Sequence, residues 1–240
     1  MDLKEADILG CAIRDHWYYI SKGRAIRKIL GNLKVPEVLD VGAGSGIFSR
    51  QLLDEGYCET AVCLDTNYPS EKIEIHNGKK IFFVKSIDRT SQKLVLMMDV
   101  LEHVSNDLAL LTTYTQDLER DDLVLITVPA FQFLWSSHDV FLEHHRRYTI
   151  RMIEDVIVKA GMTPVKSRYF FGVLFPVVAG IRLLKKFLLG CGVLKAKSEL
   201  KIYPAWLNKT LVAIHDLERN TLFGINKFFG LSLFVLCRKN

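Results

Sequence analysis

The sequence predicts a doubly wound α/β fold, in which helices cover both faces of a mostly parallel β-sheet. Three features support this: short apolar runs alternate with helically spaced segments, a glycine-rich loop follows the first apolar run, and no repeat or low-complexity linker interrupts the order. The 240 residues suffice for one such domain with a large core. Hydrophobic residues make up 49% and charged residues 25% of the chain, as in globular proteins.

The first half of the chain predicts alternating helices and strands. Residues 6–31 read as one or two helices that end near Gly31-Asn32. The apolar run 35–41 is closed by glycines and is typical of a strand entering a turn. The alternation then continues with a helix over 48–55, strands over 60–64, 80–84 and 94–98, and a helix over 106–120. The last of these strands is apolar throughout, as in a parallel strand buried on both faces.

The second half predicts three more strands and an insertion. A strand over 123–128 is followed by a helix over 149–160 that is capped by Gly161. Strands near 165–170 and 231–237 complete the sheet. Between them lie two apolar, lysine-containing helical stretches, at 170–194 and at about 205–229. This insertion exceeds what a minimal fold of this kind needs.

A glycine-rich loop, Val38-Leu-Asp-Val-Gly-Ala-Gly-Ser-Gly46, lies where the first strand turns into a helix. Glycines let the backbone turn tightly and approach a ligand closely, and open α/β sheets bind ligands at this edge. The second strand ends at Asp65, 19 residues after Gly46, where a carboxylate can accept both hydroxyls of a ribose. A tight turn without a ligand is the alternative, and the acid makes it less favoured.

The spacing of the loop glycines bears on the cofactor. Dinucleotide sites use G-x-G-x-x-G, because a pyrophosphate sits on the helix N-terminus. Here the spacing is Gly42-x-Gly44-x-Gly46, and Asp40 precedes the first glycine by two residues. An acid in this place suits the ammonium of the amino-carboxylate tail of S-adenosylmethionine (SAM) and disfavours a pyrophosphate. The predicted cofactor is therefore SAM, with S-adenosylhomocysteine (SAH) as its product.

Several segments carry a resemblance to a known family. Asp40-Val-Gly-Ala-Gly-Ser-Gly46 resembles motif I of class I SAM-dependent methyltransferases, and Met98-Asp-Val-Leu-Glu-His-Val104 resembles the segment after their fourth strand. His16-Trp-Tyr-Tyr19 and the His-Asp-x4-His-x-Arg-Arg-Tyr segment from His138 to Tyr148 are similar to a bacterial subgroup linked to polysaccharide or lipid-linked glycan synthesis. The apolar insertion with an embedded Glu218 completes a match over nearly the whole chain.

The resemblance implies a Rossmann-like sheet of seven strands, mostly parallel with one antiparallel strand, and a helical insertion between the last two strands. It implies one domain over 1–240, in which 1–31 form a helical cap and 170–230 form the insertion. It also implies a set of cofactor-binding residues, which are Asp40, Gly42, Ala43, Gly44, Gly46, Asp65, Thr66, Ser86, Ile87, Asp99, Tyr19 and Arg24.

Within that set the resemblance gives each residue a role. Asp65 would hold the ribose, Ser86 or Ile87 would flank the adenine, and Asp99 would lie beside the methionine moiety. Tyr19 and Arg24 would close the pocket from the N-terminal helix, with Arg24 pairing the SAM carboxylate. The segment Lys85-Ser-Ile-Asp-Arg89 departs from the Gly-Asp pattern that the family has at this place.

Polar residues gather after the fourth and fifth predicted strands. His103, His138 and His144 are the candidate general bases, since a histidine can take a proton from an acceptor hydroxyl near neutral pH. The candidate substrate-binding residues are Glu102, Asp139, Arg146, Arg147 and Tyr148, in which the arginines could bind a phosphate. The alternatives are that Glu102 and His103 cap the next helix and that the arginines form a solvated pair. No spacing of His, Cys and carboxylates demands a metal.

The insertion 170–230 predicts contact with a surface. Pro176 and Arg182 interrupt its first apolar stretch before the roughly 20 residues that a membrane span needs. Residues 181–240 hold 11 Lys or Arg and 3 Asp or Glu, a net charge of +8. An amphipathic helix lying on an anionic membrane fits this pattern, and a lid over the site or a dimer seam are the alternatives.

Together these features predict a methyltransferase that transfers a methyl group to O or N of a small or lipid-linked acceptor, such as a glycan carrier or a quinone-like phenol. The alternatives are an NAD(P)-dependent oxidoreductase and a non-catalytic SAM-binding module that docks to a membrane enzyme. No nucleic-acid substrate is expected, because no Asn-Pro-Pro-Tyr or Asp-Pro-Pro-Tyr segment follows the fourth strand. The five scattered cysteines suit a reducing compartment, and the polar N-terminus is unlike a secretory signal. The expected location is the cytoplasm, with peripheral contact to the membrane.

Overall fold

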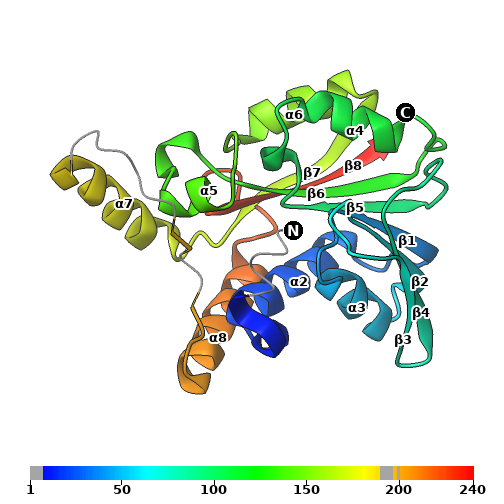
Figure 1. Cartoon of the computed structure of the whole chain (residues 1–240). Coiled ribbons are helices and arrows are strands. Elements are labelled where there is room, and N and C mark those ends of the chain that lie inside the picture. The colour runs from blue at the N-terminus through cyan, green and yellow to red at the C-terminus, as the bar shows by residue number, and fades with distance from the viewer. Residues whose placement is uncertain (1–7, 190–196, 199–200) are drawn as a thin grey trace.

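An eight-stranded β-sheet forms the centre of the computed structural model, which describes residues 8–189, 197–198 and 201–240. The strands are β1 (Val35–Val41), β2 (Cys58–Leu64), β3 (Lys72–His76), β4 (Lys79–Val84), β5 (Leu94–Met98), β6 (Leu123–Pro129), β7 (Met162–Phe170) and β8 (Ser232–Lys239). Their order across the sheet is β3-β4-β2-β1-β5-β6-β8-β7 (Figure 1). The five neighbouring strands β4, β2, β1, β5 and β6 pair in parallel. Strand β8 runs antiparallel to both β6 and β7. The prediction of a doubly wound, mostly parallel sheet is therefore confirmed.

The prediction of seven strands was wrong, because β3 adds an eighth at the edge, antiparallel to β4. β3 and β8 thus run in the direction opposite to the other six strands, where one antiparallel strand was predicted. β3 alternates apolar and polar residues, but its Ile73 and Ile75 are 65% and 61% exposed, so it lacks the continuous apolar run of the buried strands. Asn77 and Gly78 join it to β4 with φ angles of 50° and 81°, the left-handed conformation that a tight hairpin requires.

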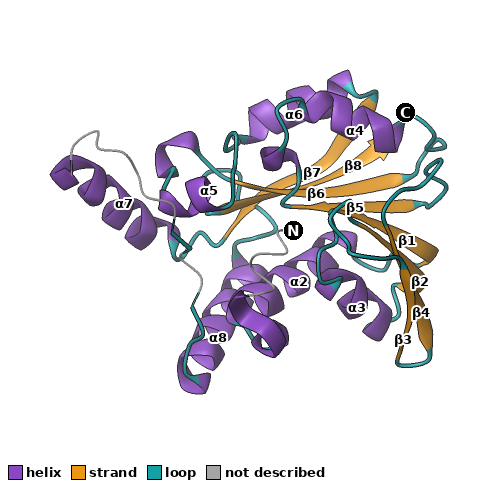
Figure 2. Ribbon diagram, viewed as in Figure 1, coloured by secondary structure: helices purple, strands orange, loops and turns teal. Residues whose placement is uncertain are grey.

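Helices cover both faces of the sheet (Figure 2). On one face lie α2 (Trp17–Leu30), α3 (Ile47–Asp54) and α8 (Ala205–Thr221), and on the other lie α4 (Asp107–Thr115) and α6 (Ile150–Lys159). Two separate clusters of buried apolar side chains fill the two interfaces. The remaining helical elements are η1 (Gly10–Arg14), η2 (Leu101–His103), η3 (Gln132–Leu134), α5 (Ser137–Phe141) and α7 (Phe175–Leu189).

The insertion between β7 and β8 consists of α7 and α8, shorter than the two predicted stretches. The first stretch was predicted over 170–194, of which 190–194 lie outside the described residues. The second ends at Thr221, where a turn leads towards β8. The helix predicted over 106–120 likewise ends early, at Thr115. The α5 helix was not predicted, although Ser136 and Asp139 form a capping box at its start.

The N-terminal helix α2 packs directly against α8 of the insertion. The backbone N–H of Trp17 donates to Oδ1 of Asn208 at 3.2 Å, and the Trp17 and His215 rings stack with centroids 5.3 Å apart. The ring of His16 hydrogen-bonds the carbonyl of Lys201 at 3.2 Å. Two segments almost two hundred residues apart in sequence thus form one layer.

Glu218 holds the insertion to the end of β7. Its side chain is 1% exposed, and Oε1 accepts a hydrogen bond from the backbone N–H of Gly172 at 2.6 Å. Its other oxygen, Oε2, lies 3.0 Å from Nδ1 of His215, on the same helix. The glutamate embedded in an apolar stretch therefore satisfies buried donors that would otherwise lack partners.

Candidate functional site

Two adjoining cavities open at the carboxyl ends of the parallel strands. The larger, of about 560 Å³, lies beside the glycine loop and is called the loop cavity here. The smaller, of about 490 Å³, extends under α7 and α8 and is called the insertion cavity. Asp99, His103 and Leu142 line both, so the two cavities meet at these side chains. Ligands in the two cavities would therefore contact each other at this boundary.

The glycine loop turns immediately after β1. Gly42, Gly44 and Gly46 have φ angles of 66°, 53° and 69°, which side chains rarely adopt. A Cβ on Gly46 would also lie 3.1 Å from Sγ of Cys63, so an alanine there would be both strained and crowded. The backbone N–H of Gly42 donates to the carbonyl of Leu64 at 2.7 Å, which ties the loop to the end of β2.

Asp65, at the end of β2, braces the same loop. Its Oδ2 accepts a hydrogen bond from the backbone N–H of Gly44 at 3.2 Å, and its Oδ1 accepts one from Asn67 at 2.9 Å. The carboxylate also lines the loop cavity together with Gly42 and Thr66. Each oxygen retains a lone pair, so Asp65 can accept two further hydrogen bonds from a ligand.

Not every predicted cofactor residue reaches the wall of the loop cavity. Gly42, Asp65, Thr66 and Asp99 line it, whereas Ala43, Gly44 and Gly46 shape the loop behind it. Ser86 and Ile87, which were predicted to flank the adenine, follow β4 and line neither cavity. The segment that contains them lacks the family pattern, and residues just after β2 form the wall instead.

Asp40 lies beneath the loop and not in the cavity. It is 1% exposed, and its Oδ2 accepts a hydrogen bond from Oγ of Ser49 at 2.7 Å. Its Oδ1 has no hydrogen-bond partner among the described residues. Burial raises the pKa of Asp40 to about 6. Asp40 can therefore orient the loop through α3, at a cost to the stability of the folded chain.

Asp40→Asn is expected to stabilise the ligand-free protein at pH 8 but not at pH 4. A raised pKa means that the folded state binds the proton more tightly, so stability falls as the pH rises from 3.8 to about 6. The rise in the pKa of Asp40 from 3.8 to about 6 corresponds to a loss of about 3 kcal/mol in the free energy of unfolding at pH 8. Asp40→Asn would remove this loss. Urea unfolding at the two pH values measures this, with the exposed Asp54→Asn as control. An equal effect at both pH values would contradict the expectation.

Asp99 follows β5 and is held by three groups. Its Oδ1 accepts a hydrogen bond from Oγ1 of Thr127 at 3.0 Å, and its Oδ2 accepts one from the Tyr18 hydroxyl at 3.1 Å. The ammonium of Lys22, which is fully buried, forms an ion pair with the same Oδ2. Burial tends to raise the pKa of Asp99, but the charge and hydrogen bond of Lys22 outweigh it and lower the pKa to about 2. Asp99 is therefore an ionised carboxylate at the boundary of the cavities.

Tyr19 and Arg24 were predicted to close the cofactor pocket, and both side chains contact other parts of the protein. Tyr19 is fully buried in the core beside Phe48, and Arg24 forms an ion pair with Asp216 of α8. Neither lines a cavity. The face of α2 towards Asp99 instead carries Tyr18 and Lys22, which are four residues apart and so lie on one side of the helix. The packing of α2 on α8 sets this rotation, and the motif alone does not reveal it.

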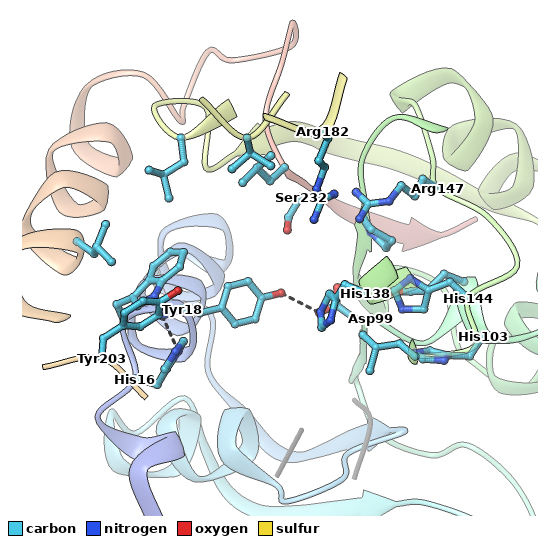
Figure 3. A pocket seen from close by; sticks show the side chains of 18 of the residues that line it. His16, Tyr18, Asp99, His103, His138, His144, Arg147, Arg182, Tyr203 and Ser232 are labelled. Atoms are coloured by element: carbon cyan, nitrogen blue, oxygen red, sulfur yellow. Dashed lines mark hydrogen bonds between the residues drawn. The ribbon is translucent and has the colours of Figure 1, made fainter. Parts of the chain in front are cut away.

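The acidic and histidine side chains gather at one end of the insertion cavity (Figure 3). His103, His138, His144 and Glu102 all line it, which brings the three predicted general bases together. The rings of His103 and His144 meet edge to face with centroids 4.7 Å apart. Burial, with the neighbouring His144, lowers the pKa of His103 to about 4, so its ring is neutral at pH 7.

Asp139, Arg146 and Tyr148 were predicted to contact the substrate, and in the structure each side chain is held by a neighbouring residue. Asp139 is fully buried and pairs with Arg147 at 2.7 and 3.0 Å, and Arg146 pairs with Asp107 at 3.0 Å. The hydroxyl of Tyr148 donates to Asp107 at 2.8 Å. These residues hold the loop after β6 in place. Arg147 lines the insertion cavity, and its guanidinium donates to Asp139 and to the carbonyl of Ala130.

The opposite end of the insertion cavity is aromatic and apolar, and sequence reasoning did not assign it. His16 and Tyr203 lie there, opposite the histidine cluster (Figure 3), and the ring centroid of Trp17 is 5.9 Å from that of His16. Apolar side chains from the insertion complete the wall, and these are Leu174, Val178, Leu207 and Leu211. Side chains of the insertion thus form part of the wall of this cavity. The cavity suits a ligand with an apolar body and one polar end.

Comparisons with known proteins identify the family of the chain and show solved structures with a similar fold. A family model described as a methyltransferase domain matches residues 15–167. The chain is similar to the crystal structure of a SAM-dependent methyltransferase from Archaeoglobus fulgidus, with a TM-score of 0.55 and 16% identity over 99% of this chain and 98% of that chain. It is also similar to a Burkholderia thailandensis 1,6-didemethyltoxoflavin-N1-methyltransferase with bound 1,6-didemethyltoxoflavin and SAH, with a TM-score of 0.51 and 15% identity over 92% and 78% of the two chains. No curated protein sequence matches significantly.

Proposed function

This chain belongs to the methyltransferase domain family, and we propose that it transfers a methyl group from SAM in the loop cavity to an oxygen or nitrogen of an acceptor in the insertion cavity. One observation carries the proposal: the two cavities meet at Asp99 and His103. Methyl transfer needs donor and acceptor in line at near-attack distance, and adjoining cavities with a common boundary provide that alignment.

The residues of the loop cavity fit SAM. Of the described side chains that line it, Asp65, Asp99 and Glu143 are acidic and none is Lys or Arg. Such a wall favours a sulfonium and an ammonium, and it disfavours the pyrophosphate of a dinucleotide. Asp65 would accept the ribose hydroxyls, and Asp99 would lie near the positively charged end of the cofactor. The same wall counts against the NAD(P)-dependent alternative.

When bound, SAM supplies an electrophilic methyl group whose leaving group departs neutral. The chain needs to orient the acceptor, exclude water and accept one proton. The leucines of α8 and the aromatic end of the insertion cavity would orient and desolvate the acceptor. The neutral His103, beside Glu102 and His144, would take the proton from an acceptor hydroxyl or amine.

The apolar wall of the insertion cavity supports an amphipathic acceptor, such as a lipid-linked glycan or a quinone-like phenol. Val178 of α7 and the leucines of α8 would contact its apolar part, and the reactive atom would reach the histidine end. Titration with SAH and with NADH, followed by a screen of lipid-linked sugars and phenols, tests both halves of the proposal. Binding of NADH and not of SAH would overturn it.

His103→Ala is expected to lower kcat by about 10²- to 10⁴-fold with the substrate that the screen identifies. The reason is that the variant lacks the imidazole that would take the proton from the methylated group. The affinity for SAH should change little, since Asp65 and the loop remain intact. The matched control is His76→Ala, which alters a histidine on β3 that pairs with Asp54 far from both cavities. Unchanged turnover in His103→Ala would exclude this role.

We further propose that α7 lies on the surface of an anionic membrane. Its outward stripe repeats every three or four residues and carries Val177, Ile181, Leu184 and Phe187, of which Phe187 is 85% exposed. Lys185 lies beside the stripe, whereas Arg182 and Lys186 donate hydrogen bonds to the carbonyls of Leu134 and Phe133. In the described part of the chain no helix has the length and apolarity to span a bilayer.

Sedimentation with vesicles tests the membrane proposal. The protein should bind vesicles rich in phosphatidylglycerol at low salt, and should bind phosphatidylcholine vesicles more weakly. Phe187→Glu should reduce binding without loss of fold, because the side chain is already exposed to solvent. Ile73→Glu, on the exposed edge strand β3, is the matched control. Equal binding by both variants, or no binding by the native chain, would contradict the proposal.

A further inference from the structure

We propose that Glu102, His103 and His144 bind one divalent metal ion at the boundary between the two cavities. Each offers one ligand atom, and these atoms all lie within 4.8 Å of one another. Two imidazoles and one carboxylate suit zinc, manganese or iron(II), and leave coordination positions open for a ligand. The residues come from η2 and from the loop after α5, so they carry no spacing that a sequence motif would reveal.

Glu102 provides the first reason. It is fully buried, and neither carboxylate oxygen has a hydrogen-bond partner among the described residues. A buried carboxylate without a partner is costly, and native structures pair such groups or place them on a cation. Lys22 is the buried ammonium of this region, but its ion pair is with Asp99. A metal ion would satisfy both oxygens of Glu102.

His144 provides the second reason. Its Nδ1 lies 3.0 Å from Oδ1 of Asp139, whereas its buried Nε2 has no partner in the part of the chain that the structure describes. Metal-binding histidines commonly donate one ring N–H to a carboxylate, which fixes the tautomer and directs the other nitrogen at the ion. Arg147 and the backbone of Ser136 hold Asp139 rigidly in that supporting position.

His103 completes the set, and the backbone joins its segment to that of His144. The ring of His103 lies edge to face against the ring of His144, with the centroids 4.7 Å apart. The backbone N–H of His145 donates to the carbonyl of Glu102 at 2.7 Å. The ligands are therefore positioned by main-chain contacts, so they need only small side-chain adjustments to close on an ion.

The position of the metal site suggests a role for the ion in the reaction. This role rests on the proposed methyl transfer, whereas the binding of the ion does not depend on it. Glu102, His103 and His144 all line the insertion cavity, where the acceptor would lie. An ion held there would make His103 a ligand in place of a proton acceptor: it would lower the pKa of an acceptor hydroxyl that binds it, and water would take the proton. The oxygen is then held close to Asp99 and to the cofactor.

Calorimetric titration of the EDTA-treated protein with Zn²⁺, Mn²⁺ and Mg²⁺ tests the site without any acceptor. We expect one ion per chain and a metal-dependent rise in Tm. Glu102→Gln and His144→Asn should weaken binding by more than about 100-fold, and Asp139→Asn by about 10- to 100-fold. Glu102→Gln should still fold, since it removes a buried charge that has no protein partner. His76→Ala, which alters a surface histidine, should bind the ion normally.

The outcome separates this inference from the proposed function. If no ion binds stoichiometrically, or if Glu102→Gln and His144→Asn bind as tightly as the native chain, the metal site is excluded. SAH titration of the same EDTA-treated protein then reports on the cofactor cavity alone. Retained SAH binding would leave methyl transfer intact, with His103 as the proton acceptor.

Discussion

The affinity for SAH should fall about 100-fold or more in Asp65→Ala. Asp65 lines the loop cavity at the end of β2, where its two oxygens can accept the hydroxyls of a ribose. Each hydrogen bond to a charged group contributes about 1.5–3 kcal/mol, so two such bonds exceed the 2.7 kcal/mol that a 100-fold change represents. The variant also frees the backbone N–H of Gly44, which loosens the loop itself.

Isothermal titration with SAH measures the effect, and Glu143→Ala is the matched control. Glu143 lines the same cavity and carries the same charge, but it is exposed and lies on the loop after α5. If the loss of charge alone decided affinity, the two variants would weaken binding equally. We expect Glu143→Ala to bind within about threefold of the native protein, as exposed charges contribute little. Equal losses would refute the assignment of Asp65 to the ribose.

Lys22→Met should lower the free energy of unfolding by about 3–5 kcal/mol at pH 7. Lys22 is fully buried, and its ion pair with Asp99 is the contact that keeps both groups charged. Removal of one partner leaves an uncompensated carboxylate in a largely buried place. The pKa of Asp99 is lowered to about 2, so this stabilisation is present above pH 3.8 and is lost as the pH falls towards 2.

A second substitution distinguishes the ion pair from simple packing. Lys22→Met combined with Asp99→Asn removes both charges, so the double variant should be more stable than Lys22→Met alone. Urea unfolding at pH 7 and near pH 3 measures the free energies of unfolding of the native protein and of the variants. The difference in this free energy between Lys22→Met and the double variant should be smaller near pH 3. Additive losses at pH 7 would show that Lys22 acts through its packed methylenes and not through its charge.

The buried strands and the glycine loop could be predicted because their signals are local. β5 is apolar at every position, and the φ angles of Gly42 and Gly46 follow from residue type. The edge strand β3 was missed because its isoleucines face solvent, although the Asn77-Gly78 turn was a usable signal.

The contacts of the polar side chains at the site could not be predicted, because they depend on tertiary packing and not on local signals. The charged segment from Asp139 to Tyr148 offers several partners, and sequence alone does not decide whether its arginines meet a ligand or a neighbouring acid. The structure pairs Arg147 with Asp139 and Arg146 with Asp107. The Ser136–Asp139 capping box is visible in the sequence and would have indicated a structural role for Asp139. The rotation of α2, which places Tyr18 and not Tyr19 at Asp99, depends on its contacts with α8.

The pairing of α2 with α8 has a consequence for how the chain acquires its structure during synthesis. The Trp17 amide finds its partner on Asn208, 191 residues later. The ribosome must therefore release most of the polypeptide before this layer can assemble, and until then the side of the early helix that carries Trp17 stays uncovered. Contacts of such long range slow folding, so we expect the glycine-loop half of the nascent chain to become protease-resistant well before the first helix does.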